Sequence, residues 1–145
     1  DAGVTPTPVT APSQEPGRGP RLEYETTLFT TGPVKVWVYL SPRNPVLNPD
    51  GLRYAISVDD GTPQVVNVTR ATGADDTSMN RQWERNTSDN VNRTVTTHDI
   101  TTPGRHTVKF WMVDPTVVVQ KIVIDTGGLP TSYFGPPEST RARTR

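Results

Sequence analysis

The sequence predicts an all-β protein, an antiparallel β-sandwich of about seven or more strands with one short helical or loop insertion. Apolar and polar residues alternate with a period of two in several stretches, which is typical of strands with one face on a core. Turn signals rich in Gly, Pro, Asn and Asp separate these stretches, and only one segment has a helical composition. Short alternating strands with little helix are typical of a sandwich.

The predicted strands follow one another at short intervals. The first twenty residues, DAGVTPTPVTAPSQEPGRGP, have instead the composition of a linker, because Pro cannot donate to a strand ladder and Gly adds conformational entropy. After them, period-two patterning predicts seven strands. They are LEYET (22–26), VKVWVYL (34–40), LRYAISV (52–58), PQVVNV (63–68), NRTVTTHDI (92–100), GRHTVKFWM (104–112) and TVVVQKIVID (116–125).

Two connections carry clear turn signals. The third and fourth strands are joined by DDG (59–61), a hairpin signal in which Gly61 is expected to take a positive φ. The last two strands flank a tight turn at Asp114 and Pro115. Both connections are short, which favours antiparallel strands over crossover helices.

One segment leans towards a helix. DDTSMNRQWERNTSDN (75–90) offers N-capping residues at its start, and Trp83 is its one large apolar residue. Its Asn, Ser and Thr content makes it a weak helix former. We therefore expect a loop with one or two helical turns, fixed to the sandwich by Trp83.

Composition excludes several classes of function. The 145 residues contain 15 basic and 15 acidic side chains, so the clustered positive charge needed to bind nucleic acid is absent from the folded region. Residues 140–145 form a basic tail that we interpret as solvated. There is no cysteine, hence no disulfide or thiolate site, and no apolar run is long enough to span a membrane. We expect neither nucleic acid nor a membrane as a partner.

No catalytic or cofactor motif emerges from the sequence. Asp59-Asp60 and Asp75-Asp76 are adjacent carboxylates beside turn glycines, and the turn interpretation is favoured over a glycosidase acid/base pair. A calcium site at Asp59-Asp60 would lack the repeated ligand spacing of an EF-hand. His98 and His106 show no metal-ligand pattern, so we interpret them as structural or exposed. The chain alone is predicted to be non-catalytic, with no cofactor and no metal.

Three aromatic residues are the candidates for contact with a partner. Trp37, Tyr39 and Trp111 each lie opposite the more regular apolar set of their strand. Aromatic rings beside polar groups suit sugars and protein interfaces alike. Packing against further polypeptide or a second subunit is the favoured explanation. A sugar platform and an ordinary core with the facing reversed remain as alternatives.

Several motifs together resemble one family. They are PVTAPS (8–13), LEY (22–24), VYLSP (38–42), LRYAISVDDGTPQVVNV (52–68) and PGRHTVKFWMVDPTVVVQKIVIDTGGLPTSYFGPPES (103–139). The chain is similar to the C-terminal β-sandwich domain of glycoside hydrolase family 115, the xylan α-1,2-glucuronidases. The resemblance implies that residues 1–139 form one accessory domain that includes the Pro-rich start. It also implies a first strand upstream of Asp1, so that this chain is a fragment.

The resemblance also implies a function. The catalytic residues of such enzymes lie in upstream domains, and none can be carried onto this sequence. The chain would support hydrolysis of (4-O-methyl-)glucuronic acid side groups of xylan by packing on the upstream catalytic domains, by forming a homodimer or by holding xylan oligosaccharide. The alternatives are an independent carbohydrate-binding module for xylan and a pure oligomerisation module. The parent enzyme is expected to be secreted or periplasmic.

Overall fold

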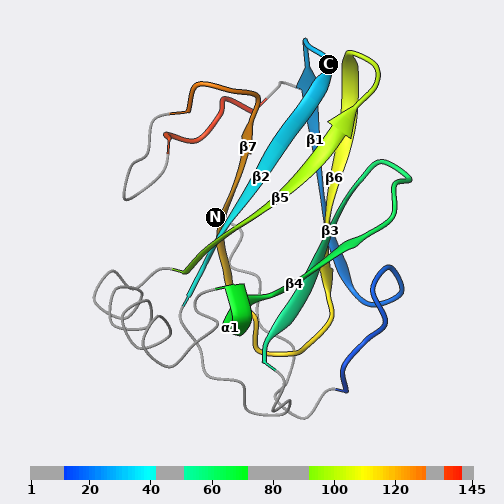
Figure 1. The fold of residues 1–145 in the computed structure, drawn as a ribbon, viewed down its shortest axis with the longest axis vertical. Helices are drawn as coiled ribbons and strands as arrows, with labels where there is room; N and C mark the ends of the chain where they lie inside the picture. Colours follow the sequence, from blue (N-terminus) through cyan, green and yellow to red (C-terminus); the bar gives the residue numbers. More distant parts are fainter. Residues whose placement is uncertain (1–11, 42–50, 72–91, 130–135, 142–145) are drawn as a thin grey trace.

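The computed structural model describes residues 12–41, 51–71, 92–129 and 136–141, and these form a sandwich of two antiparallel sheets (Figure 1). The first sheet has four strands in the order β1-β6-β3-β4, and the second has three in the order β5-β2-β7. The predicted all-β fold is confirmed. The strands are β1 (Arg21–Leu28), β2 (Gly32–Leu40), β3 (Arg53–Val58), β4 (Gln64–Asn67), β5 (Asn92–Ile100), β6 (Gly104–Met112) and β7 (Val119–Asp125).

Most connections pass from one sheet to the other. Only β3 and β4 are consecutive strands that pair directly, as a hairpin. Strands β6 and β7 both form as predicted, but they belong to different sheets. The Asp114-Pro115 segment therefore connects the two layers and does not close a hairpin. None of the described residues form a helix that could cross a membrane.

The core lies between the sheets and is built from alternate residues of each strand. In β2 the even-numbered residues point inward, as the alternation predicted, and Val36 and Val38 are fully buried. The rings of Tyr54 and Phe110 stack with their centroids 4.8 Å apart. The main cluster comprises Val36, Val38, Leu40, Leu52, Tyr54, Ile56, Val66, Val68, Val108 and Phe110.

Strand β5 turns a polar face towards this core. Its inward positions are Asn92, Thr94, Thr96 and His98, all buried. The Tyr54 hydroxyl hydrogen-bonds the Thr94 hydroxyl, and burial raises the pKa of Tyr54 to about 12. Buried hydroxyl groups need such partners, because an unpaired one costs desolvation energy. The β-branched residues of this run favour a strand. Its inward face is mainly polar and ends at the buried Ile100, which packs with Leu28 and Val34.

The β3–β4 hairpin forms where it was predicted, but not for the predicted reason. Gly61 does not take a positive φ; Asp59 does, with a φ of 52°. The Gly61 amide donates to the Val58 carbonyl over 3.0 Å and closes the turn. Asp tolerates the left-handed region better than most residues. The Asp59 carboxylate is held here from the neighbouring strand, since its Oδ1 accepts the Thr107 amide over 2.9 Å.

One short helix, α1 (Val68–Ala71), follows β4. Asn67 caps it, because its side-chain oxygen accepts the Arg70 amide over 3.1 Å. The predicted helical insertion at residues 75–90, with Trp83 and Asp75-Asp76, lies outside the described residues.

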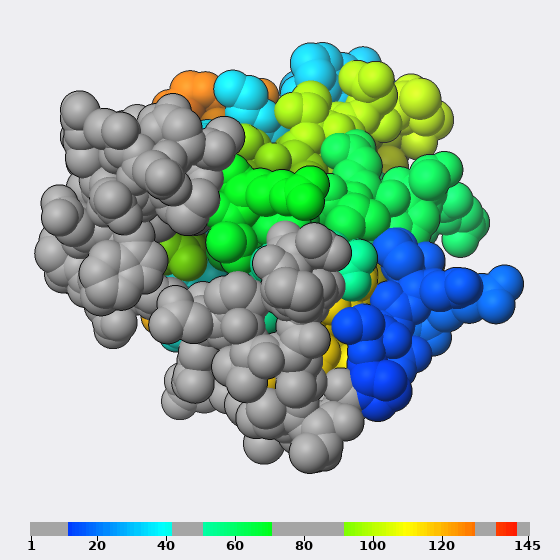
Figure 2. Space-filling model, turned by 60° about the horizontal axis from the view of Figure 1, so that its bottom comes forward, coloured from blue at the N-terminus to red at the C-terminus, as the bar shows by residue number. Residues whose placement is uncertain are grey.

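The described part of the Pro-rich start packs on the sandwich. The Gln14 amide donates to the Val113 carbonyl over 2.6 Å, and the Met112 amide donates to the Pro20 carbonyl over 2.9 Å. A Cβ placed on Gly17 would lie 3.2 Å from Pro63, beside the β3–β4 hairpin. Figure 2 shows this segment (blue) flanking the hairpin (green). Residues 12–20 therefore belong to the fold, as the family resemblance implied, and do not behave as a linker.

Candidate functional site

Trp37 and Tyr39 lie on the outer face of the three-stranded sheet. Trp37 sits in the middle strand between Val95 of β5 and Val123 of β7, and it is half-buried. Its indole nitrogen is buried without a hydrogen-bond partner among the described residues. Tyr39 is only 6% exposed. Of the two, Trp37 alone offers accessible ring surface.

Trp111 lies on the outer face of the other sheet, on the opposite side of the sandwich. It is 7% exposed, and its indole N–H donates to the Ser57 hydroxyl over 2.9 Å. The guanidinium of Arg21 lies 5.0 Å from the centre of the ring, close enough for a cation–π interaction. Trp111 thus packs against its own domain, together with Ala55 and Val113.

The structure does not bring the three aromatic candidates together. Trp37 and Tyr39 share one face, while Trp111 faces the other way, so no single platform can include all three. Whether any of them contacts a sugar or another polypeptide stays a prediction.

The predicted turn carboxylate Asp59 pairs with a buried histidine. Asp59 Oδ2 lies 2.7 Å from His106 Nδ1, and His106 Nε2 donates to the Thr102 carbonyl over 2.7 Å. The hydrogen bond to Asp59 raises the pKa of His106, with a second contribution from Thr102. Burial alone would raise the pKa of Asp59, but the hydrogen bonds from His106 and Thr107 outweigh it and lower that pKa. The pair links the β3–β4 turn to the start of β6.

The contacts of His98 also indicate a structural role. Its Nδ1 lies 3.3 Å from Gln64 Nε2, and its Nε2 lies 2.8 Å from the Thr96 hydroxyl. The Gln64 amide is a donor, so the imidazole proton resides on Nε2. Burial lowers the pKa of His98. Within the part of the chain that the structure describes, no three His, Asp or Glu side chains are grouped to hold a metal ion.

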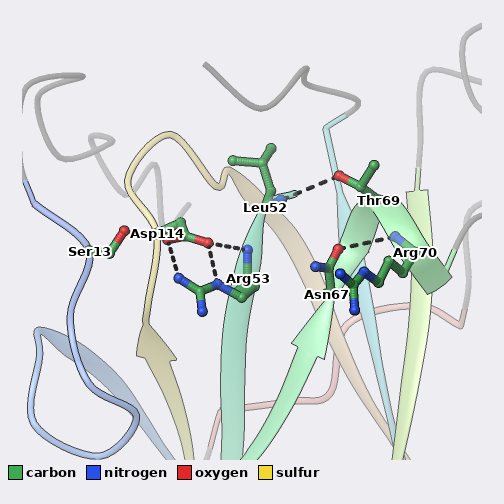
Figure 3. Close-up of polar contacts among 7 residues, drawn as sticks. All are labelled: Ser13, Leu52, Arg53, Asn67, Thr69, Arg70 and Asp114. Atoms are coloured by element: carbon green, nitrogen blue, oxygen red, sulfur yellow. Dashed lines mark hydrogen bonds and ion pairs between the residues drawn. The ribbon is translucent and has the colours of Figure 1, made fainter. Parts of the chain in front are cut away.

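A carboxylate that the sequence reasoning treated as a turn residue forms a buried clamp. Asp114 has a 2% exposed side chain and forms a two-pronged ion pair with Arg53, at 2.9 Å and 3.1 Å (Figure 3). It also accepts the Arg53 amide over 2.9 Å and the Ser13 hydroxyl over 2.6 Å. Burial alone would raise the pKa of Asp114, but Arg53 and Ser13 lower it. The clamp ties the N-terminal segment, β3 and the β6–β7 connection together.

A groove opens between the edge strands of the two sheets, where β1 and β7 lie on the same side of the sandwich. It is open to solvent and has a volume of about 740 Å³. Its walls come from the end of β1 with the loop that follows, from β7, and from residues 136–139. Lys121 holds the last wall in place by donating to the Pro136 carbonyl over 2.9 Å. Sequence reasoning missed this groove, because it depends on which strands become sheet edges. Phe29, an aromatic residue outside the strand patterns, was its one signal.

Comparison with known families decides what kind of domain this is. Residues 1–138 match the Glycosyl hydrolase family 115 C-terminal domain. The chain belongs to this family. The resemblance seen in its sequence motifs is thereby confirmed.

One solved structure has a fold similar to that of this family 115 domain. It is described as a novel family GH115 4-O-methyl-alpha-glucuronidase with specificity for decorated arabinogalactans. The two chains are 22% identical with a TM-score of 0.63, a likeness that shows a shared fold. The aligned region covers 76% of this chain and 14% of the relative, so the family 115 domain spans a small part of that longer protein. A search of curated proteins gave no match.

Proposed function

We propose that this chain is the non-catalytic C-terminal domain of an α-glucuronidase. The parent enzyme would hydrolyse the α-1,2 bond that joins glucuronic acid or 4-O-methylglucuronic acid to xylan. The observation that carries the proposal is the family match over residues 1–138, since that family is a C-terminal domain of glycosyl hydrolases. The solved structure of similar fold is described as a 4-O-methyl-alpha-glucuronidase, which supports a glucuronidase reaction; its stated specificity is for decorated arabinogalactans, so the choice of xylan rests on the sequence motifs. The parent enzyme is secreted or periplasmic, where polymeric xylan is accessible.

Within the parent enzyme, we assign the domain a packing role against the upstream catalytic domains. The Asp114 clamp supports this role, because it fixes the N-terminal segment to both β3 and the β6–β7 connection. A homodimer would use the same rigid sandwich as its building block.

The test compares two proteins on one substrate. The parent polypeptide is expected to release 4-O-methylglucuronic acid from aldouronic oligosaccharides, while the 145-residue chain releases none at any pH. Uronic acid release by the chain itself, abolished by Asp59→Asn or Asp60→Asn, would contradict the accessory role. A parent polypeptide without glucuronidase activity would contradict the assignment of the reaction.

An independent carbohydrate-binding module is the second candidate function. The half-buried Trp37, flanked by a 43% exposed Val95, favours it, because an accessible ring on a flat sheet face can stack on a sugar. In that case glucuronoxylan oligosaccharides would shift the tryptophan fluorescence of the chain. Trp37→Ser would abolish the shift, and Val65→Ala on the far sheet would leave it unchanged.

A further inference from the structure

The groove between β1 and β7 has the size of a ligand site. Its volume of about 740 Å³ falls within the roughly 300–1,000 Å³ of typical small-molecule clefts. It does not involve Trp37, Tyr39 or Trp111. It lies where each sheet ends, since β1 pairs only with β6 and β7 only with β2 among the described strands. Its walls therefore combine side chains with strand-edge backbone.

The lining combines hydroxyl groups with exposed apolar surface. Phe29 stands at the groove with 86% of its surface exposed, the most exposed large apolar residue in the described part of the chain. Pro136 and Pro137 form further apolar wall. Five lining side chains carry a hydroxyl group that can both donate and accept hydrogen bonds: Thr26, Thr27, Thr30, Thr126 and Ser139.

The charges that line the groove are balanced. Among the described residues, its charged lining side chains are Lys121 and Glu138, one of each sign. The Lys121 ammonium already donates to the Pro136 carbonyl. Lys121 and Glu138 leave the groove without excess positive charge, so it has no electrostatic preference for an acidic sugar. A neutral ligand with many hydroxyl groups and apolar C–H faces matches the lining best.

We propose that this groove binds a neutral stretch of polysaccharide, such as the unsubstituted β-1,4-xylose backbone between glucuronic acid side groups. Phe29 supplies the apolar face for a sugar ring, and the Thr and Ser hydroxyls bond its hydroxyl groups. The choice of xylan rests on the proposed function. The groove would hold the backbone of the polymer while the acidic side group enters the catalytic domain of the parent enzyme.

The test titrates the 145-residue chain with two soluble probes, neutral xylotetraose and an acidic aldotetraouronic acid, by calorimetry. Xylotetraose should bind more tightly. Phe29→Ala should weaken that binding about tenfold, since the ring face is lost. Glu138→Gln should reduce the difference in affinity between the neutral and the acidic probe. The control Val65→Ala changes a 50% exposed side chain on β4, away from the groove, and should leave both affinities unchanged.

Three outcomes would overturn the proposal. The acidic probe binds as tightly as the neutral one, Phe29→Ala leaves binding unchanged, or neither sugar binds. In the third case, sedimentation tests whether the chain forms a dimer that Phe29→Ala dissociates. Such a dimer would make the groove a subunit interface. Phe29 is too exposed for its loss to unfold the chain, and Thr30→Val gives a second, independent variant. Glucuronidase activity of the parent polypeptide on aldouronic acid is measured separately, so failure of the groove and failure of the proposed function are distinguishable.

Discussion

Asp114 accepts hydrogen bonds from two distant parts of the chain, at Ser13 and Arg53. Asp114→Ala would remove the carboxylate that accepts the Arg53 amide and pairs with its guanidinium. Because Arg53 is partly solvated, we expect a loss of about 2–3 kcal/mol of unfolding free energy, less than for a fully buried pair. Urea denaturation measures it. Asp60→Asn, at a fully exposed carboxylate, should change stability by less than about 0.5 kcal/mol.

The His106–Asp59 pair predicts a pH dependence of stability. The pKa of His106 is raised, so its contribution is complete below about pH 6.5 and is lost as the pH rises through the folded-state value. The pKa of Asp59 is lowered, so its contribution is present above about pH 4 and is lost in acid. The pair should therefore stabilise most between about pH 4 and 6.5.

Comparing wild type with His106→Gln isolates this effect. The difference between their urea midpoints should be largest near pH 5 and smaller at pH 8. His98 acts in the opposite sense, because its lowered pKa makes acid destabilising, but it is present in both proteins and cancels in the difference. The groups near Asp59 that also influence the comparison are Lys109 and Asp60. A constant difference from pH 5 to pH 8 would mean that the pKa of His106 is the same in the folded and the unfolded chain.

At the scale of elements, the turn of the β3–β4 hairpin leaves little space for a side chain at Gly61. A Cβ at Gly61 would lie 3.0 Å from the Val58 carbonyl oxygen, which is closer than an ordinary contact. Gly61→Val should therefore destabilise by about 1–2 kcal/mol through crowding, not through backbone dihedral strain. Thermal melts measure the change. Thr62→Val, at an exposed neighbouring position in the same turn, should leave the midpoint nearly unchanged.

The strands were predictable because their alternation is local. VKVWVYL became a strand with the expected inward set, and NRTVTTHDI became a strand as predicted, since neither alternation nor β-branched composition needs knowledge of partners. Sheet membership was not predictable, because it depends on contacts between distant segments. For the same reason Asp114 was interpreted as a turn residue. Its ion-pair partner Arg53 is 61 positions away, so no local sequence pattern indicated the pair. Asp59, and not Gly61, takes the positive φ, and its carboxylate contacts His106 and Thr107, which are distant in sequence and gave no local signal.

For the aromatic candidates, the sequence indicated which residues to consider but not what surrounds them. Trp111 and Trp37 were both identified as lying opposite the regular apolar set, and both do point away from the central core. Alternation predicts the strand face on which a side chain lies, but not which residues cover that face. Arg21 and Ser57 reach Trp111 only because β1 and β3 flank β6 in the four-stranded sheet. The groove at the β1 and β7 edges exists only at the level of the whole sandwich.

At the scale of the whole molecule, the two tryptophans on opposite faces should respond differently to substitution. Trp111 is 7% exposed and bonded to Ser57, so Trp111→Ser removes a buried ring and should cost about 3–5 kcal/mol, enough to unfold a marginal domain. Trp37 is half-buried at a solvent-facing sheet surface, so Trp37→Ser should cost about 1–2 kcal/mol and leave a folded chain.

Circular dichroism and urea titration of the two single variants separate these effects. If the Trp37 face also packs against the upstream polypeptide, the isolated chain should self-associate, because exposed apolar patches promote association. Sedimentation should then show that Trp37→Ser is more monomeric than wild type. A folded Trp111→Ser chain of near wild-type stability would mean that Arg21 and Ser57 do not fix the ring. In that case Trp111, not Trp37, would be the better candidate for contact with the parent enzyme.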